Sequence, residues 1–266
     1  MIRDITIGQY YPADSVVHRL DPRVKLAGTM IYIISLFLFD TFICYAAAAL
    51  FLFAVIRISK VPIRFIVRGL KSIVILLLFA VVFNIFLTPG EVLFRAGFIR
   101  ITREGLRLAA FMGIRMILLI MGSSIMTFTT TPNQLTDGLE SLLGPLKKLG
   151  VPVHEIAMMM SIALRFIPIL LEETDKIMKA QQARCADFES GGLVSKAKSL
   201  VPILVPLFVS AFRRANDLAL AMEARCYRGG EGRTKMKPLC YHRPEYAAYG
   251  ILAVYFVLII GINAAV

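Results

Sequence analysis

Residues 24–56 read VKLAGTMIYIISLFLFDTFICYAAAALFLFAVI, an almost uninterrupted apolar run. The run is too long for a single membrane helix, because about 20 helical residues cross the hydrocarbon core of a bilayer. Asp40 and Thr41 interrupt it near the middle. We therefore predict a helical hairpin, with membrane spans near 24–39 and 42–57.

Later apolar runs predict three more spans, near 65–87, 105–130 and 247–266. The fourth span carries Arg115 near its centre, and a charged residue inside a span is a functional candidate by default. A role in transport is one interpretation of Arg115. An internal tether to Asn84 or to a backbone carbonyl is the favoured one. The five runs together predict an all-α, polytopic integral membrane protein.

The composition supports a membrane protein with segregated charge. The 266-residue chain is 58% hydrophobic, against roughly 45–50% in ordinary soluble domains, yet its formal net charge is +12. Lys and Arg gather before the first span, in residues 57–71 and in residues 132–244. Because positively charged loops stay in the cytoplasm, we predict a cytoplasmic N-terminus, an outer C-terminus, and location in the inner or plasma membrane of a prokaryote.

Residues 132–244 differ in character from the spans on either side. Long helices are predicted at 153–188 and 195–227, and each begins apolar and ends polar, so neither looks like a simple span. Each would reach on the order of 50 Å if straight, and internal prolines should bend both. We therefore divide the chain into membrane helices (1–131), a cytoplasmic coupling-helix region (132–244) and a C-terminal membrane helix (245–266).

The two long helices end in the same motif, AQQARCADF at 180–188 and AMEARCYRG at 221–229. An arginine near a helix C-terminus interacts favourably with the helix dipole, by roughly 0.3–1 kcal/mol, which would explain one copy. Two copies flanked by small residues leave each guanidinium clear of its neighbours. Such an arginine suits insertion into a pocket of another protein, where its planar fork pairs with carboxylates or carbonyls.

Three stretches carry a family resemblance: GQYYPADSVVHRLDPRVKL at 8–26, SIALRFIPILLEETDKIMKAQQARC at 161–185, and RRANDLALAMEARCYRG at 213–229. Together they resemble the transmembrane coupling subunit (T component, EcfT family) of energy-coupling factor transporters, which are ABC-type importers of vitamins and metal ions. The N-terminal stretch is more similar to the type shared among several substrate-binding subunits.

The resemblance implies an L-shaped coupling subunit in the lipid bilayer, with no catalytic, cofactor-binding or metal-binding residues and no nucleic-acid partner. Two cytoplasmic ATPase subunits would bind the helix ends, and ATP hydrolysis would reorient a small membrane substrate-binding (S) subunit. The implied ATPase contacts are Ala183, Arg184, Cys185, Ala224, Arg225 and Cys226. The expected contacts with the S subunit are Met158, Met159, Met160 and Leu164, for which ordinary core packing is an equal alternative.

The sequence departs from the family pattern after each motif arginine, where Cys185 and Cys226 replace the usual glycine. Glycine readily adopts the left-handed conformation that caps a helix, and cysteine does so poorly. We therefore expect small size, rather than cap geometry, to matter at these two positions. A redox role for the cysteine pair is the alternative.

Two other function classes fit the sequence less well. A secondary transporter would need inverted repeats and polar groups near the membrane midplane, and no second half resembles the first. A membrane-embedded enzyme would need a convergent set of reactive side chains, and the sequence contains no His-x-x-x-His, Asp-x-x-Asp or Gly-x-Ser-x-Gly. It also contains no Walker phosphate loop, so any ATP would be hydrolysed by a partner.

Overall fold

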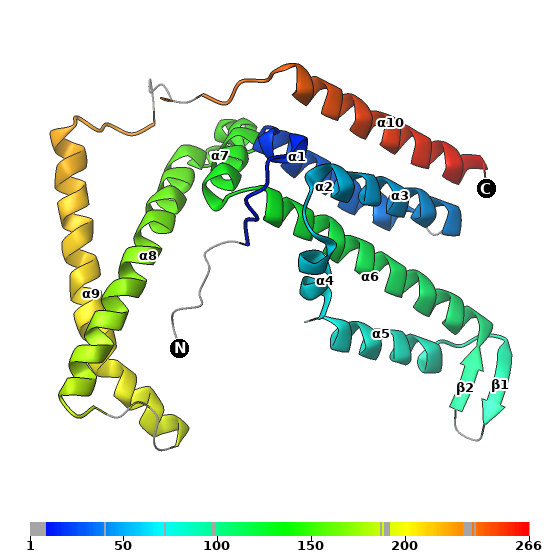
Figure 1. Ribbon diagram of the computed structural model, residues 1–266, viewed down its shortest axis with the longest axis horizontal. Coiled ribbons are helices and arrows are strands. Elements are labelled where there is room, and N and C mark those ends of the chain that lie inside the picture. The colour runs from blue at the N-terminus through cyan, green and yellow to red at the C-terminus, as the bar shows by residue number, and fades with distance from the viewer. Residues whose placement is uncertain are drawn as a thin grey trace. The chain divides into compact units, whose positions relative to one another are not determined.

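The computed structural model describes residues 9–39, 41–71, 73–96, 99–186, 188, 192–230, 236 and 238–265. The chain divides into two compact units, one formed by Gly8–Ser141 with Leu239–Val266 and the other containing Leu142–Pro238. The described residues are almost entirely helical, which confirms the predicted fold class (Figure 1). The exception is an antiparallel hairpin of β1 (Val92–Ala96) and β2 (Ile99–Thr102), which lies between the predicted spans near 65–87 and 105–130.

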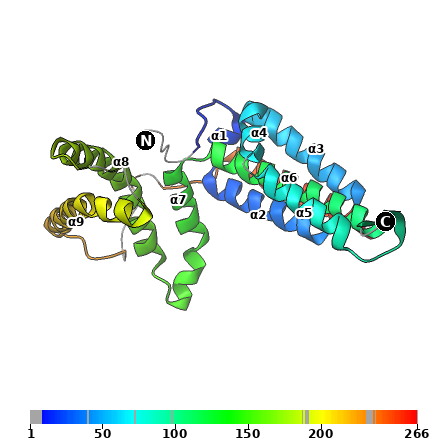
Figure 2. The ribbon, with the colours of Figure 1, turned by 90° about the horizontal axis from the view of Figure 1, so that it is seen from below.

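The first unit holds most of the apolar helices, which run side by side (Figure 2). The long helix α6 occupies the centre and contacts α2, α3, α4 and α5, while α10 contacts α2 and α3. The elements are α1 (Val16–Arg19), α2 (Pro22–Leu38), α3 (Phe42–Ser59), α4 (Ile63–Lys71), α5 (Val74–Leu87), α6 (Arg103–Thr129), α7 (Pro132–Leu142) and α10 (Arg243–Ala265).

Within the described ranges, four helices are long and apolar enough to cross a membrane: α3, α6, α10 and α8 (Val153–Ala183). Helices α4 and α5 would form a fifth crossing as a pair bent by 61°. The number of candidate crossings, up to five, agrees with the five predicted spans, but the helices that form them are not the same. The predicted helix at 65–87 is broken into α4 and α5, α2 has only 17 residues, and α8 qualifies although the sequence analysis placed it outside the membrane.

Close helix packing in the first unit depends on small residues facing large ones. A Cβ added to Gly122 of α6 would lie 2.6 Å from the ring of Tyr32 on α2. The Tyr32 ring lies beside that of Tyr255, whose hydroxyl is 2.9 Å from the Ser35 hydroxyl. Membrane helices commonly associate through such small residues and interhelical hydrogen bonds, because burial from lipid supplies little hydrophobic driving force.

The polar residues that precede and begin α2 are buried and tie the N-terminal segment to α6. The Nε2–H of His18 donates to the Tyr11 carbonyl at 3.0 Å, and Nδ1 accepts from the Ser15 hydroxyl at 2.7 Å. The Lys25 ammonium donates to the carbonyls of His18 and Thr129, both at 2.9 Å. The Ser-x-x-His-Arg-Leu-Asp-Pro-Arg-x-Lys stretch therefore has a structural role that the sequence analysis did not assign.

Arg115 is an internal tether, and one of its partners is a side chain that the sequence analysis did not name. Its Nε–H donates to the Tyr45 hydroxyl at 2.9 Å, and its guanidinium lies 5.5 Å from the centre of the Phe37 ring. The side chain of Asn84 instead donates to the Ala80 carbonyl of its own helix. The predicted Asn84 contact is therefore wrong, because a helical carbonyl four residues back already satisfies that amide.

The second unit is built from the short helix η1 (Gly144–Leu149) and two long helices, α8 and α9 (Leu193–Ala224). Figure 1 shows α8 and α9 as an antiparallel pair with a bend near the start of α9. Pro202 and Pro206 lie inside α9, where each removes a backbone donor. Pro206 has no backbone N–H that could donate to the Pro202 carbonyl four residues earlier. That carbonyl instead accepts a hydrogen bond from the side-chain amide of Gln181 at 3.4 Å.

Candidate partner-binding site at the helix ends

The two Ala-Arg-Cys motifs form the same structure, a Schellman cap at the end of a helix. In the first motif the backbone N–H of Ala186 donates to the Gln181 carbonyl, and that of Cys185 donates to Gln182. In the second, Tyr227 donates to Met222 and Cys226 to Glu223. All four hydrogen bonds are between 2.8 and 3.0 Å, so the matching motifs fold into matching caps.

Both cysteines occupy the left-handed position of the cap. The φ angle is 65° at Cys185 and 56° at Cys226, in the region that glycine normally occupies. Both helix ends therefore keep the glycine-type cap although a cysteine occupies it. The hydrogen bonds of the cap hold the backbone in place, and the strain of a left-handed side chain is tolerated.

The motif arginines stand at the cap positions and are exposed. Arg184 and Arg225 have nearly identical backbone angles, with φ of −92° and −91° and ψ of 17° and 15°. Neither guanidinium has a hydrogen-bond or ion-pair partner within the part of the chain that the structure describes. The flanking residues are exposed as well, so both tips can reach another protein: Ala183, Cys185, Ala224 and Cys226.

The helix pair is held together at equivalent positions of its two members. Arg225 follows Arg184 by 41 positions, and Arg214 follows Glu173 by the same interval. The Glu173 carboxylate accepts from Arg214 at 2.7 Å and also from the Ser210 hydroxyl. Equivalent residues of the two helices therefore meet, and each tip lies the same number of residues beyond the meeting point.

The antiparallel arrangement puts the two arginine tips at opposite ends of the pair. Each arginine lies eleven residues beyond the Glu173–Arg214 contact, or about 16 Å at 1.5 Å per residue. The tips are therefore separated by on the order of 30 Å along the pair. Sequence analysis did not identify the Glu173–Arg214 pair, and the shared 41-residue interval is the signal in the sequence that could have found it.

An apolar surface covers the first halves of the same helices. Of the four residues predicted to contact a substrate-binding subunit, Met159 and Met160 are exposed, and Met158 and Leu164 are partly buried. A larger exposed stripe lies on α9, where apolar side chains recur every four residues and Phe208 is 67% exposed. The sequence analysis noted this apolar segment without identifying its face. The stripe, hereafter the α9 stripe, consists of Leu200, Val201, Leu204, Val205, Phe208, Val209 and Phe212.

No metal-binding cluster of three or more His, Cys, Asp or Glu side chains occurs in the described ranges. The four cysteines are unpaired, with Cys44 buried and the other three exposed. What the site offers a partner is two exposed cations and a set of exposed apolar side chains.

The fold and the site define a polytopic helical membrane protein that presents two equivalent, exposed arginine tips. Residues 13–236 match the model of the CbiQ family, described as cobalt transport protein. The chain is also similar to proteins named energy-coupling factor transporter transmembrane protein EcfT. The relative from Clostridium kluyveri is 58% identical over 250 residues, 93% of each chain. That from Thermosediminibacter oceani is 55% identical over 256 residues, 95% of this chain and 97% of its own.

A further relative, from Bacillus subtilis, carries the same name and is 50% identical over 242 residues, 91% of each chain. The chain therefore belongs to the EcfT family, the transmembrane components of energy-coupling factor transporters. This confirms the family predicted from the sequence and makes the chain a membrane transporter component.

Proposed function

We propose that this subunit transmits the movement of two cytoplasmic ATPase subunits to a substrate-binding membrane subunit, which takes up a vitamin or a metal ion. Arg184 and Arg225 each enter a groove on one ATPase. The observation that carries the proposal is the equivalence of the two tips, which share one cap geometry and lie equally far from the Glu173–Arg214 contact. Two equivalent tips fit two equivalent binding grooves.

The caps supply the rigidity that this role requires. A Schellman cap fixes the backbone on both sides of the arginine, so a force applied to the guanidinium is passed to the helix rather than absorbed by a loop. Arginine suits the contact because it stays charged in a partly dry groove and pairs in a fixed geometry. The helices then act as levers that turn about their crossing when the ATPases approach one another.

The exposed apolar side chains of α8 and α9 provide the surface for the substrate-binding subunit. Contiguous apolar patches on a protein mark interaction sites, and the α9 stripe continues over three helical turns. Met159 and Met160 add flexible side chains that adapt to more than one partner. In this arrangement the ATPases hold the helix ends while the S subunit rests on the helix faces. In this proposal the N-terminus of the subunit lies in the cytoplasm, because Lys and Arg gather before the first span.

The ATPase contact is tested by co-purification from cells that express all subunits. The double variant Arg184→Glu with Arg225→Glu should insert normally into the membrane, lose the ATPases and abolish uptake. The control is Arg165→Glu with Arg213→Glu, which reverses two other exposed arginines of the same helices. Retention of both ATPases by the first double variant would refute the arginine contacts.

The contact with the substrate-binding subunit has its own test. Leu204→Asp with Phe208→Asp should release that subunit and leave the ATPases bound, because the charges lie on the stripe and far from the tips. Leu149→Asp, at an 81% exposed position on η1, is the matched control. Loss of the ATPases with retention of the S subunit would contradict the assignment of the two surfaces.

A further inference from the structure

The first unit contains an apolar cavity of about 400 Å³ between α1, α2, α3, α6 and α10. Its volume is within the range of small-molecule sites, about 300–1,000 Å³. The lining residues cover similar intervals on the helices, from Val24 to Tyr32 on α2 and from Ile58 back to Phe51 on α3. Seven helical residues span about 10 Å, which is roughly a third of the 30 Å hydrocarbon core.

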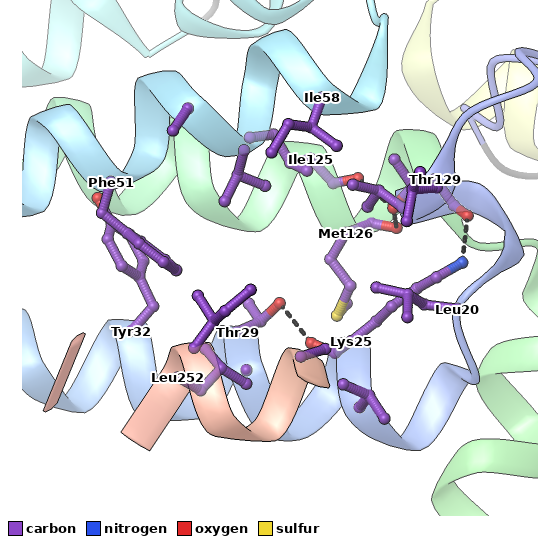
Figure 3. A pocket seen from close by; sticks show the side chains of 18 of the residues that line it. Leu20, Lys25, Thr29, Tyr32, Phe51, Ile58, Ile125, Met126, Thr129 and Leu252 are labelled. Atoms are coloured by element: carbon purple, nitrogen blue, oxygen red, sulfur yellow. Dashed lines mark hydrogen bonds between the residues drawn. The ribbon is translucent and has the colours of Figure 1, made fainter. Parts of the chain in front are cut away.

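The one charged side chain among the described lining residues is Lys25, whose ammonium lies at one end of the cavity (Figure 3). Lys25 is only 8% exposed and donates two of its three hydrogens to the carbonyls of His18 and Thr129. The third has no acceptor, and no carboxylate lies within 4 Å of the ammonium, among the residues that the structure describes. The Asp21 carboxylate acts on this ammonium only from beyond 4 Å, and a buried cation without a directly bonded anion is costly, so an anionic oxygen at this place would be strongly favoured.

The acidic residues nearest to this end are occupied by other contacts. The carboxylate of Asp21 caps α2 by accepting from the backbone of Arg23, and that of Glu245 accepts from the backbone of His242. Exposed cations stand beside the lining residues instead. Arg57 directly precedes Ile58. Arg243 likewise precedes Pro244, and both are exposed. Such cations gain about 1 kcal/mol each from an anionic lipid surface.

The cavity opens through an apolar rim. Val16, Ile58 and Ile251 line it and are 62%, 52% and 60% exposed, whereas the deeper residues Tyr32 and Leu52 are buried. Figure 3 shows Tyr32 and Phe51 at the end opposite Lys25. An amphiphile in this cavity would place its charged group at Lys25 and its hydrocarbon toward Tyr32. This order matches a lipid in one leaflet, with the headgroup at the helix ends and the chain toward the midplane.

We propose that the cavity binds one acyl chain of an anionic phospholipid whose phosphate accepts the third hydrogen of Lys25. The second acyl chain passes the open rim and stays in the bilayer, which a fully enclosed pocket would not allow. The bound lipid fills the space between α2, α3 and α10 and neutralises the buried ammonium. This site is independent of the arginine tips and of the proposed ATPase contacts.

The test uses the full-length chain in nanodiscs of phosphatidylcholine with phosphatidylglycerol, followed by native mass spectrometry of the released protein. The wild type should retain one phosphatidylglycerol per chain in preference to phosphatidylcholine, because the quaternary ammonium next to the phosphate of phosphatidylcholine would lie among the cations Lys25, Arg57 and Arg243. Lys25→Gln keeps donors for both carbonyls but loses the charge, and should lose this preference by about tenfold. Ala248→Phe on α10 and Ala54→Phe on α3 each add an aromatic ring at the rim of the cavity, and either should abolish retention of the lipid.

Ala253→Phe is the matched control, because Ala253 is exposed on α10 and does not line the cavity. Equal retention of the two lipids by the wild type would overturn the proposal. Unchanged lipid retention in both Ala248→Phe and Ala54→Phe would also overturn it. A photoreactive amino acid at Ile58 should crosslink to lipid in the assembled transporter. Crosslinking to a polypeptide there would show that a partner helix occupies the cavity instead, which also overturns the proposal.

Discussion

Glu173 and Arg214 form a 2.7 Å ion pair between equivalent positions of two helices that run in opposite directions. The pair lies where α8 and α9 meet, and the Ser210 hydroxyl also donates to the carboxylate. Both motif arginines are eleven residues away, one on each side. The contact therefore fixes the register of the helix pair and, with it, the positions of the two tips.

Removing the Glu173–Arg214 ion pair should weaken the packing of α8 against α9. Because both side chains are partly exposed, we expect Glu173→Gln and Arg214→Gln to be coupled by about 1 kcal/mol in a double-mutant cycle. Thermal unfolding of the purified chain measures the coupling. Transport should fall more than ATPase retention, since the tips remain intact but lose their register. A coupling energy near zero would show that the contact does not hold the helices together.

Replacing one motif arginine by lysine separates the charge from the geometry of the tip. Arg184→Lys keeps the positive charge but loses the planar fork, so we expect about tenfold weaker ATPase binding, equivalent to the loss of one charge-assisted hydrogen bond. Arg225→Lys should behave in the same way because the two caps match. Surface-plasmon binding of the ATPases to nanodiscs measures both variants. Undiminished affinity would mean that charge alone is recognised.

Restoring glycine at the left-handed cap positions should stabilise the second unit. Cys185→Gly and Cys226→Gly each relieve an unfavourable φ angle, and we expect a gain of about 0.5–1 kcal/mol in the free energy of unfolding. Valine at either position should destabilise by a similar amount. Cys240→Gly is the control, because it removes a thiol from a position without positive φ. Loss of transport in the glycine variants would instead indicate a role for the thiols.

The buried His18 predicts a pH dependence of stability. Burial lowers the pKa of His18, and the Lys25 ammonium lowers it further. The folded protein therefore takes up this proton less readily than the unfolded chain, whose pKa is near 6.5. Stability should fall as the pH drops below about 6.5 and be constant above it.

The contribution of His18 is isolated by comparison with His18→Gln, whose amide can still donate to the Tyr11 carbonyl. The difference in melting temperature between the two proteins, measured from pH 5 to pH 8, should shrink toward acid pH. A difference that is independent of pH would show that His18 is not the group responsible.

Gly122 tests the close approach of α6 and α2. Gly122→Ala places a methyl group 2.6 Å from the Tyr32 ring, so the ring must shift, and we expect a loss of about 1–3 kcal/mol. Gly113→Ala on the same helix is the control, because its added carbon would be 3.5 Å from Val81, an ordinary contact. Equal melting temperatures for the two variants would contradict the tight packing at Gly122.

The sequence by itself determined the apolar helices, the repeated motif and the family. These follow from local patterns: the length of an apolar run sets a span, and matching residues at two helix ends form matching caps. The left-handed cysteines were missed because the hydrogen bonds of each cap override the propensity of the single residue. Only the tertiary structure decided which distant residues meet, as with Lys25 and Thr129, 104 positions apart, or Glu173 and Arg214. Helix periodicity gives the face on which a side chain lies, but the opposing helix, its direction and its register depend on the packing of the whole unit.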